Sequence, residues 1–145
     1  MKNSVQILQF TLHDASFGCD VTELEQILSM MTLEIIPNAP PYLQGMMNLN
    51  GTLIPVFNLS RYLKLKPLSY DLDTSILLAK TDGKPVGFIV DRVIDLFHVE
   101  RNAIQQDGLF KEKKSPYLGN IVIDDKPCLI VQFQRIINDI QAVRQ

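Results

Sequence analysis

The chain has 145 residues, about one ordinary domain, and its 46% hydrophobic and 21% charged residues are globular values that argue against disorder. Fourteen basic and 16 acidic residues give a net charge of −2, which argues against generic binding to nucleic acid or to an anionic membrane surface. No apolar run approaches the length of a membrane span, so we expect a cytoplasmic protein with no direct membrane insertion.

The first half of the chain predicts short strands separated by tight turns. An apolar strand at 6–12 is followed by the polar turn HDAS and a second strand in SFGCD. In VTELEQIL, the residues Leu24, Ile27 and Leu28 have the spacing of a short helical turn, with carboxylates between them. Farther on, two apolar strands flank Asn50-Gly51, a dipeptide typical of a tight hairpin turn because both residues accept a positive φ at low cost.

The second half repeats the first. PYLQGMMNLNGTLIPVFNLSRYL matches SPYLGNIVIDDKPCLIVQFQRII when Gly45 is aligned with Gly119 and one gap is placed at Gln44. Upstream, SFGCDVTELEQIL aligns without a gap on PVGFIVDRVIDLF, so that Ile27 falls on Leu96. We expect the two glycines to lie at equivalent turns, and Asp82-Gly83 to form a tight hairpin turn like that of Asn50-Gly51.

This repeat predicts a mainly β fold made of two duplicated small barrels within a single domain, 1–145. The halves give subdomain 1 at about 5–68 and subdomain 2 at about 75–137. Each half of about 70 residues would be marginal alone, so we expect them to share an apolar core. A C-terminal helix at about 133–144 follows from apolar residues at helical spacing, namely Ile136, Ile137, Ile140 and Val143.

Reactive chemistry is hard to find in the sequence. Cys19 and Cys128 lie in apolar, strand-like runs and are expected to be buried free thiols rather than a disulfide or a metal site. Metal-ligand spacings and glycine-rich phosphate loops are absent from the sequence. Asp91, Asp95 and Glu100 are more typical of a solvated face than of acid–base catalysis. We therefore expect no catalytic residue, metal or cofactor, and no enzyme activity.

The apolar residues around Leu24 and Leu96 favour a contact surface over chemistry. If both segments are helical turns, one apolar stripe cannot place all of these side chains in a core. Some of them could line the junction between the halves, where a partner helix could bind. The simpler interpretation is that all of them are core residues.

The whole pattern resembles the CheW-like family of bacterial chemotaxis adaptors. The resemblance is carried by FTLHDASFGCDVTELEQIL and IPNAPPYLQGMMNLNGTLIPVFNLSRYL, and in the second half by VGFIVDRVIDLF and PYLGNIVIDDKPCLIV. It extends from about Val5 to Ile137. The combination of motifs is specific to the family, although no single motif is.

The resemblance implies two SH3-like five-stranded β-barrels around a common core, and a non-catalytic role. Such an adaptor couples the regulatory domain of a CheA-type histidine kinase to the cytoplasmic tips of methyl-accepting receptors, in chemotaxis or a related chemosensory pathway. Carried over by position, the receptor-binding groove between the barrels would include Leu24, Gln26, Asn50, Val93 and Leu96. The kinase-binding end would include Gln105 and Phe110, and we expect Phe110 to be at least partly exposed.

Two positions depart from the family pattern. Asn50 stands where the family usually has Arg, and Gln26 stands where Glu is frequent; both belong to the implied receptor side. An adaptor of a specialised array, such as that of a type IV pilus, would carry such changes, as would a protein under relaxed constraint. An alternative function of another class is a small-molecule or peptide sensor that uses the groove as a pocket, which would require converging polar groups.

Overall fold

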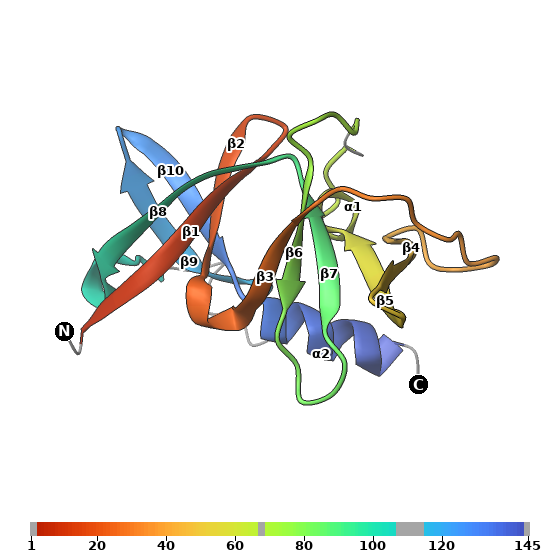
Figure 1. Ribbon diagram of the computed structural model, residues 1–145. Coiled ribbons are helices and arrows are strands. Elements are labelled where there is room, and N and C mark those ends of the chain that lie inside the picture. The colour runs from red at the N-terminus through yellow and green to blue at the C-terminus, as the bar shows by residue number, and fades with distance from the viewer. Residues whose placement is uncertain (1–2, 67–68, 107–114, 144–145) are drawn as a thin grey trace. The chain divides into compact units, whose positions relative to one another are not determined.

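The computed structural model describes residues 3–66, 69–106 and 115–143 (Figure 1). The strands from the first half of the chain are β1 Ser4–Leu12, β2 Ala15–Asp20, β3 Leu24–Ser29, β4 Leu43–Leu49 and β5 Thr52–Asn58. The strands from the second half are β6 Ser75–Ala79, β7 Val86–Val90, β8 Arg92–Glu100, β9 Tyr117–Ile123 and β10 Lys126–Val131. The helical elements are two 3-10 turns at Val21–Glu23 and Arg101–Ala103, the short helix α1 Leu59–Tyr62 and the C-terminal helix α2 Phe133–Val143.

The strands form two five-stranded mixed sheets with the orders β8-β1-β2-β10-β9 and β3-β6-β7-β5-β4. In each sheet one parallel pair, β10 with β2 or β5 with β7, joins antiparallel hairpins. The two orders become identical when each strand is replaced by its repeat equivalent. The predicted mainly β fold with a C-terminal helix is confirmed, and the duplication predicted from the sequence appears in the topology.

The compact units do not coincide with the predicted subdomains 5–68 and 75–137. One unit consists of Met1–Phe10, Asp14–Glu23 and Ile94–Gln145, and the other of Thr11–His13 and Leu24–Val93. Each sheet combines two strands of one repeat half with three of the other, because β1 and β2 lie between β8 and β10, whereas β6 and β7 lie between β3 and β5. A repeat reveals that two segments are alike, but it does not reveal which strands pair.

One of the two predicted tight hairpin turns forms as expected. Asn50 and Gly51 have φ values of 52° and 88° between the paired residues Leu49 and Thr52. The equivalent residues Asp124 and Asp125 also have positive φ, and they connect β9 to β10.

The prediction for Asp82-Gly83 is wrong. The β6–β7 pairing ends at Ala79 and Val86, and it leaves a longer loop at 80–85. In this loop the Thr81 hydroxyl donates to the Lys84 carbonyl at 2.5 Å and accepts from the Gly83 N–H at 3.1 Å. This longer loop is therefore held by hydrogen bonds of the threonine hydroxyl, whereas a two-residue turn depends on residues with positive φ.

Gly45 and Gly119 are equivalent, but they lie inside β4 and β9 rather than at turns. The ladder skips Gln44 between Leu43 and Gly45, and it skips Leu118 between Tyr117 and Gly119. Both skipped residues are β-bulges, so the structure aligns Gln44 with Leu118. The gap placed at Gln44 in the sequence alignment is wrong, because the two Pro-Tyr-Leu motifs are one residue out of structural register.

The two glycines allow the ends of each sheet to meet. After β3, the backbone of Glu34 pairs with Met46 of β4 through two hydrogen bonds of 2.8 Å. After β8, Gln105 pairs with Asn120 of β9 through bonds of 2.8 and 3.0 Å. Each sheet is thus joined edge to edge by one isolated bridge instead of a continuous ladder. The fold is SH3-like, and neither barrel is fully closed.

Each sheet has its own cluster of buried side chains. One consists of Met47, Ile54, Val56, Ile76, Leu78 and Ile89, and the other of Val5, Ile7, Ile121, Cys128 and Ile130. Helix α2 buries Ile136, Ile137 and Ile140, as the helical spacing predicts, and it also buries Phe133; the Val143 side chain is outside the described part of the structure. Cys19 and Cys128 are buried and free, as predicted. In the described part of the chain, no helix is long and apolar enough to cross a membrane.

Candidate interaction surfaces

The segments predicted as apolar helical turns are edge strands. Only Val21–Glu23 is a 3-10 turn, whereas Leu24–Ser29 is β3 and Arg92–Glu100 is β8. In the β3–β6 ladder, Leu24 pairs with Ala79 and Gln26 with Leu78, so Glu25 is an extra, bulged residue. The bulge lengthens one step of the two-residue alternation to three. It therefore produces in a strand the spacing that suggested a helix.

The same bulge separates two of the predicted receptor-binding residues. Residues paired across strands share a face of the sheet. Gln26 is opposite Leu78, which belongs to the core cluster, whereas Leu24 is opposite Ala79 on the other face. Leu24 and Gln26 thus lie near each other along β3 but point to opposite faces. On the Leu24 face the next residue is Ile27, which is opposite Leu77.

Leu96 of β8 and its repeat equivalent Ile27 of β3 have the same environment. Each is 47% exposed, although both are large apolar residues. Their neighbours Phe97 and Leu28 pack against the two core clusters, which leaves Leu96 and Ile27 outside them. The prediction that these two side chains belong to a core is wrong. Val93, also predicted at the receptor surface, is half-buried.

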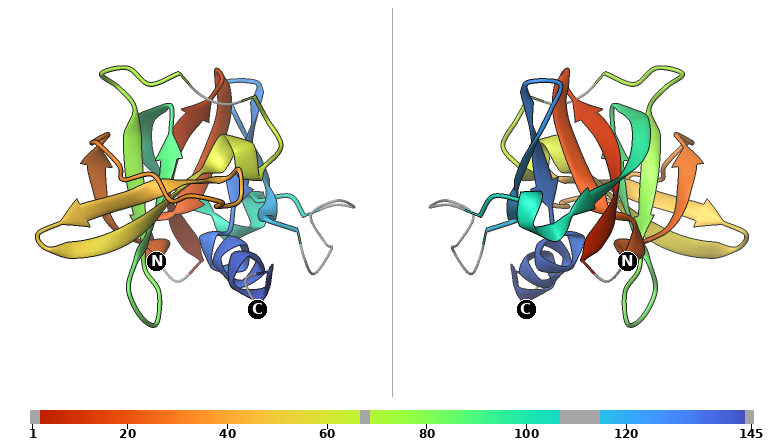
Figure 2. Two further views of the ribbon diagram at one scale, coloured as in Figure 1. Left: turned by 90° about the vertical axis from the view of Figure 1, so that its right-hand side faces the viewer. Right: turned by 90° about the vertical axis from the view of Figure 1, so that its left-hand side faces the viewer.

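Asn50 lies at the exposed tip of the β4–β5 hairpin, which extends from its sheet (Figure 2). In strand order, β4 and β3 are at opposite edges of this sheet. The turn is stabilised locally, because the Gly51 N–H donates to Oδ1 of Asn48 at 2.8 Å. The Asn50 side chain is not required for that bond and remains available for an external contact.

Gln105, predicted at the kinase-facing end, is exposed, and its backbone is held by the bridge to Asn120. The segment before it is also anchored, since the Arg101 N–H donates to the Asn3 carbonyl at 2.7 Å. Phe110, the second predicted kinase-binding residue, lies outside the described residues.

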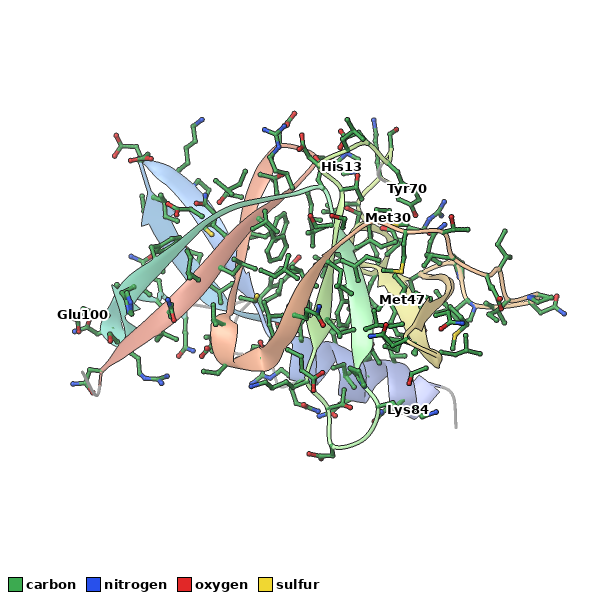
Figure 3. All side chains as sticks on the ribbon, viewed as in Figure 1. His13, Met30, Met47, Tyr70, Lys84 and Glu100 are labelled. Atoms are coloured by element: carbon green, nitrogen blue, oxygen red, sulfur yellow. The ribbon has the colours of Figure 1, made fainter. Side chains whose placement is uncertain are left out.

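A surface hollow that sequence reasoning missed lies beyond β3. It has a volume of about 480 Å³ and is lined by Met30, Met31, Thr32, Leu33, Ile35, Gln44 and Tyr70. Figure 3 shows Met30 and Tyr70 beside each other at this place. Ile35 is 83% exposed at its margin. The signal in the sequence was the pair Met30-Met31 directly after a strand, since flexible methionines are frequent at adaptable contact surfaces.

Two polar residues of the hollow, Gln44 and Tyr70, interact with Asn58. Nδ2 of the buried Asn58 donates to Oε1 of Gln44 at 3.4 Å, and its Oδ1 accepts from the Arg61 N–H at 3.1 Å. Burial raises the pKa of Tyr70, while a hydrogen bond with Asn58 and the charge of Arg61 partly offset this shift. The hollow is therefore mostly an apolar contact surface, and the converging free polar groups that a small-molecule sensor requires are not evident there.

The two cysteines are buried, and Asp95 forms a hydrogen bond with its chain neighbour. Burial is the main cause that raises the pKa values of Cys19 and Cys128, which disfavours the reactive thiolate. Asp95 accepts a hydrogen bond from the N–H of its neighbour Leu96 at 2.7 Å, a local contact within β8. Within the described ranges, no cluster of three or more His, Cys, Asp or Glu residues is placed to hold a metal ion.

Known proteins with a similar sequence belong to one family. Residues 6–141 match the family model CheW, described as a CheW-like domain. The chemotaxis protein CheW of Thermotoga maritima is 26% identical over 137 residues, which cover 93% of this chain and 89% of that protein. A probable chemotaxis protein CheW of Rhizobium etli is 22% identical over 94% of this chain and 90% of its own length.

The fold also matches a solved structure. The crystal structure of the scaffolding protein TtCheW from Thermoanaerobacter tengcongensis superposes with a TM-score of 0.81 at 24% sequence identity. The match covers 88% of this chain and 84% of that one. At this level of identity the likeness establishes the fold.

Proposed function

Because the chain belongs to the family of CheW-like domains, we propose that it is a non-catalytic signalling adaptor that couples a CheA-type histidine kinase to chemoreceptors. The pathway would be bacterial chemotaxis or a related chemosensory system, and the place of action the cytoplasm. No cofactor is required for this role, since an adaptor acts through contact surfaces.

The observation that carries the proposal is the exposure of large apolar side chains at equivalent positions of two edge strands. Leu96 and Ile27 are each 47% exposed, and their recurrence at equivalent positions of the repeat distinguishes them from exposed apolar residues that occur singly. A helical receptor tip has apolar side chains that could cover such residues. The proposed receptor-facing residues are Leu24, Gln26, Asn50, Val93 and Leu96, to which the structure adds Ile27 as a candidate.

The proposed kinase-facing residues are Gln105 and Phe110. Gln105 supports the assignment because it is exposed while its backbone is fixed. A side chain presented from a fixed backbone loses little conformational entropy on binding.

The proposal is tested by assembling the three components. The purified protein, the CheA-type kinase from the same organism and a receptor cytoplasmic fragment are mixed, and kinase autophosphorylation is measured with and without the adaptor. We expect receptor-dependent stimulation of the kinase only when all three are present. Kinase activity that does not respond to the adaptor, together with no co-sedimentation, would reject the adaptor role.

A matched pair of variants makes the test specific. Leu96→Ala should weaken receptor co-sedimentation, whereas Val122→Ala should leave it unchanged. Val122 is the right control because it is also a large exposed apolar residue, at 62%, and lies on β9 at the other edge of the same sheet. If both variants lost receptor co-sedimentation equally, the binding would be nonspecific hydrophobic association rather than contact at a receptor surface.

A further inference from the structure

We propose that Gly119 is a positioning residue for the kinase-facing surface. It allows the backbone of Gln105 to lie directly against β9, and so fixes the direction in which the Gln105 side chain leaves the protein. This inference rests on the proposed function, since it takes Gln105 to be a kinase contact.

The backbone of Gln105 approaches β9 too closely for any side chain on Gly119. A Cβ atom at Gly119 would lie 2.4 Å from the carbonyl oxygen of Gln105 and 2.9 Å from Cγ2 of Ile104. The oxygen belongs to the backbone and cannot rotate away as a side chain would. Any residue other than glycine therefore forces the segment at 104–105 to move away from β9.

The bridge that would be lost is not part of a longer ladder. Gln105 and Asn120 exchange two backbone hydrogen bonds, but the pair is isolated rather than part of a ladder. The residue before Gln105 is held separately, because the Ile104 N–H donates to the Arg101 carbonyl at 3.2 Å and the Ile104 side chain packs against the core cluster of this sheet. Movement at Gly119 would thus change the position of Gln105 without breaking the β9–β10 ladder, which runs along the other side of β9.

The repeat provides a matched control in Gly45. A Cβ atom there would lie 2.5 Å from the carbonyl oxygen of Glu34 and 3.0 Å from Cβ of Leu33. Glu34 forms the equivalent isolated bridge with Met46. Gly45→Ala therefore imposes the same local clash, but in the unit that does not contain Gln105.

The experiment compares Gly119→Ala and Gly45→Ala in the full chain. Affinity for the regulatory domain of the CheA-type kinase is measured by titration calorimetry, and receptor binding by co-sedimentation. Amide hydrogen exchange of Gln105 and Asn120 reports whether the bridge persists. We expect Gly119→Ala to lose exchange protection at both amides and to bind the kinase at least about fivefold more weakly, with receptor binding retained. Gly45→Ala should bind the kinase with unchanged affinity.

Asn120→Pro is a second route to the same state, in case Gly119→Ala fails to fold. It removes the N–H that donates to the Gln105 carbonyl. Proline is tolerated there because β9 is an edge strand and this N–H does not take part in the β9–β10 ladder. Loss of the bridge with full kinase affinity in either variant would overturn the positioning role, as would equal losses from Gly119→Ala and Gly45→Ala. A wild-type protein that binds no kinase would instead reject the proposed function. Kinase binding that is unchanged in Gln105→Ala would reject the inference alone.

Discussion

Glu23 caps the C-terminal helix from the other end of the chain, with its Oε2 accepting the backbone N–H of Gln134 at 3.1 Å. Its Oε1 also accepts the Phe133 N–H at 3.3 Å, so one carboxylate satisfies two free donors of the first turn of α2. Glu23→Ala should therefore lower the free energy of unfolding by about 1 kcal/mol, as the loss of a helix cap does. Chemical denaturation at neutral pH checks this, and an unchanged free energy of unfolding would mean that water replaces the cap without cost.

The same carboxylate should make stability depend on pH. Burial raises the pKa of Glu23, and the hydrogen bonds from Gln134 and Phe133 only partly offset this effect. Because the folded state holds this proton more tightly than the unfolded chain, protonation of Glu23 adds to stability beyond the cap itself, and this added contribution is full below the unfolded pKa. This contribution is lost as the pH rises through the pKa that Glu23 has in the folded state. In Glu23→Gln, melting temperatures measured across mildly acidic pH should lack this decline, while a decline as steep as in the wild type would exclude Glu23 as its source.

Gly51 and Gly83 should respond differently to the same substitution. Gly51 has a φ of 88°, which an L side chain adopts only with strain, so Gly51→Ala should lower the free energy of unfolding by about 1 kcal/mol. Gly83 does not have such a φ, and a Cβ atom there would have no atom within 4 Å. Gly83→Ala should leave stability unchanged or raise it slightly, because alanine restricts the unfolded chain. Equal effects in thermal melts would contradict this difference.

Ile27 should resemble Leu96 in receptor binding. Both side chains are about half exposed, so Ile27→Ser should cost little stability, because a surface substitution removes little buried area. If the receptor covers Ile27, its affinity should fall roughly fivefold or more. The matched control is Leu53→Ser, since Leu53 is 46% exposed on β5 of the same sheet. A loss only with Leu53→Ser would place the receptor contact on β5.

How far the sequence predicts the structure depends on whether a feature is local. The Asn50-Gly51 turn and helix α2 follow from short-range preferences, and both were predicted correctly. The exchange of the strand pairs β1–β2 and β6–β7 between the repeat halves depends on long-range pairing, which no local pattern encodes. The bulge at Glu25 likewise changed the apolar spacing of a strand to one that favours a helix. Exposure of Ile27 and Leu96 could not be predicted, since their sequence pattern fits a core equally well.

The last prediction concerns Asn50, whose position in the family usually carries Arg. Its φ of 52° suits Asn better than Arg, so Asn50→Arg should lower the free energy of unfolding by about 1 kcal/mol. If the exposed turn meets a receptor, the planar guanidinium should add a charge-assisted hydrogen bond and strengthen binding by on the order of 1 kcal/mol. Asn50→Gln is the control, because it brings the same backbone strain with a longer but uncharged side chain. Titration of a receptor-tip fragment against the wild type, Asn50→Arg and Asn50→Gln shows whether the receptor contacts position 50. Equal receptor affinities of the Asn50, Arg and Gln forms would mean that the receptor does not contact position 50. A receptor that contacts this position with a carboxylate or carbonyl group would bind the Arg form more tightly.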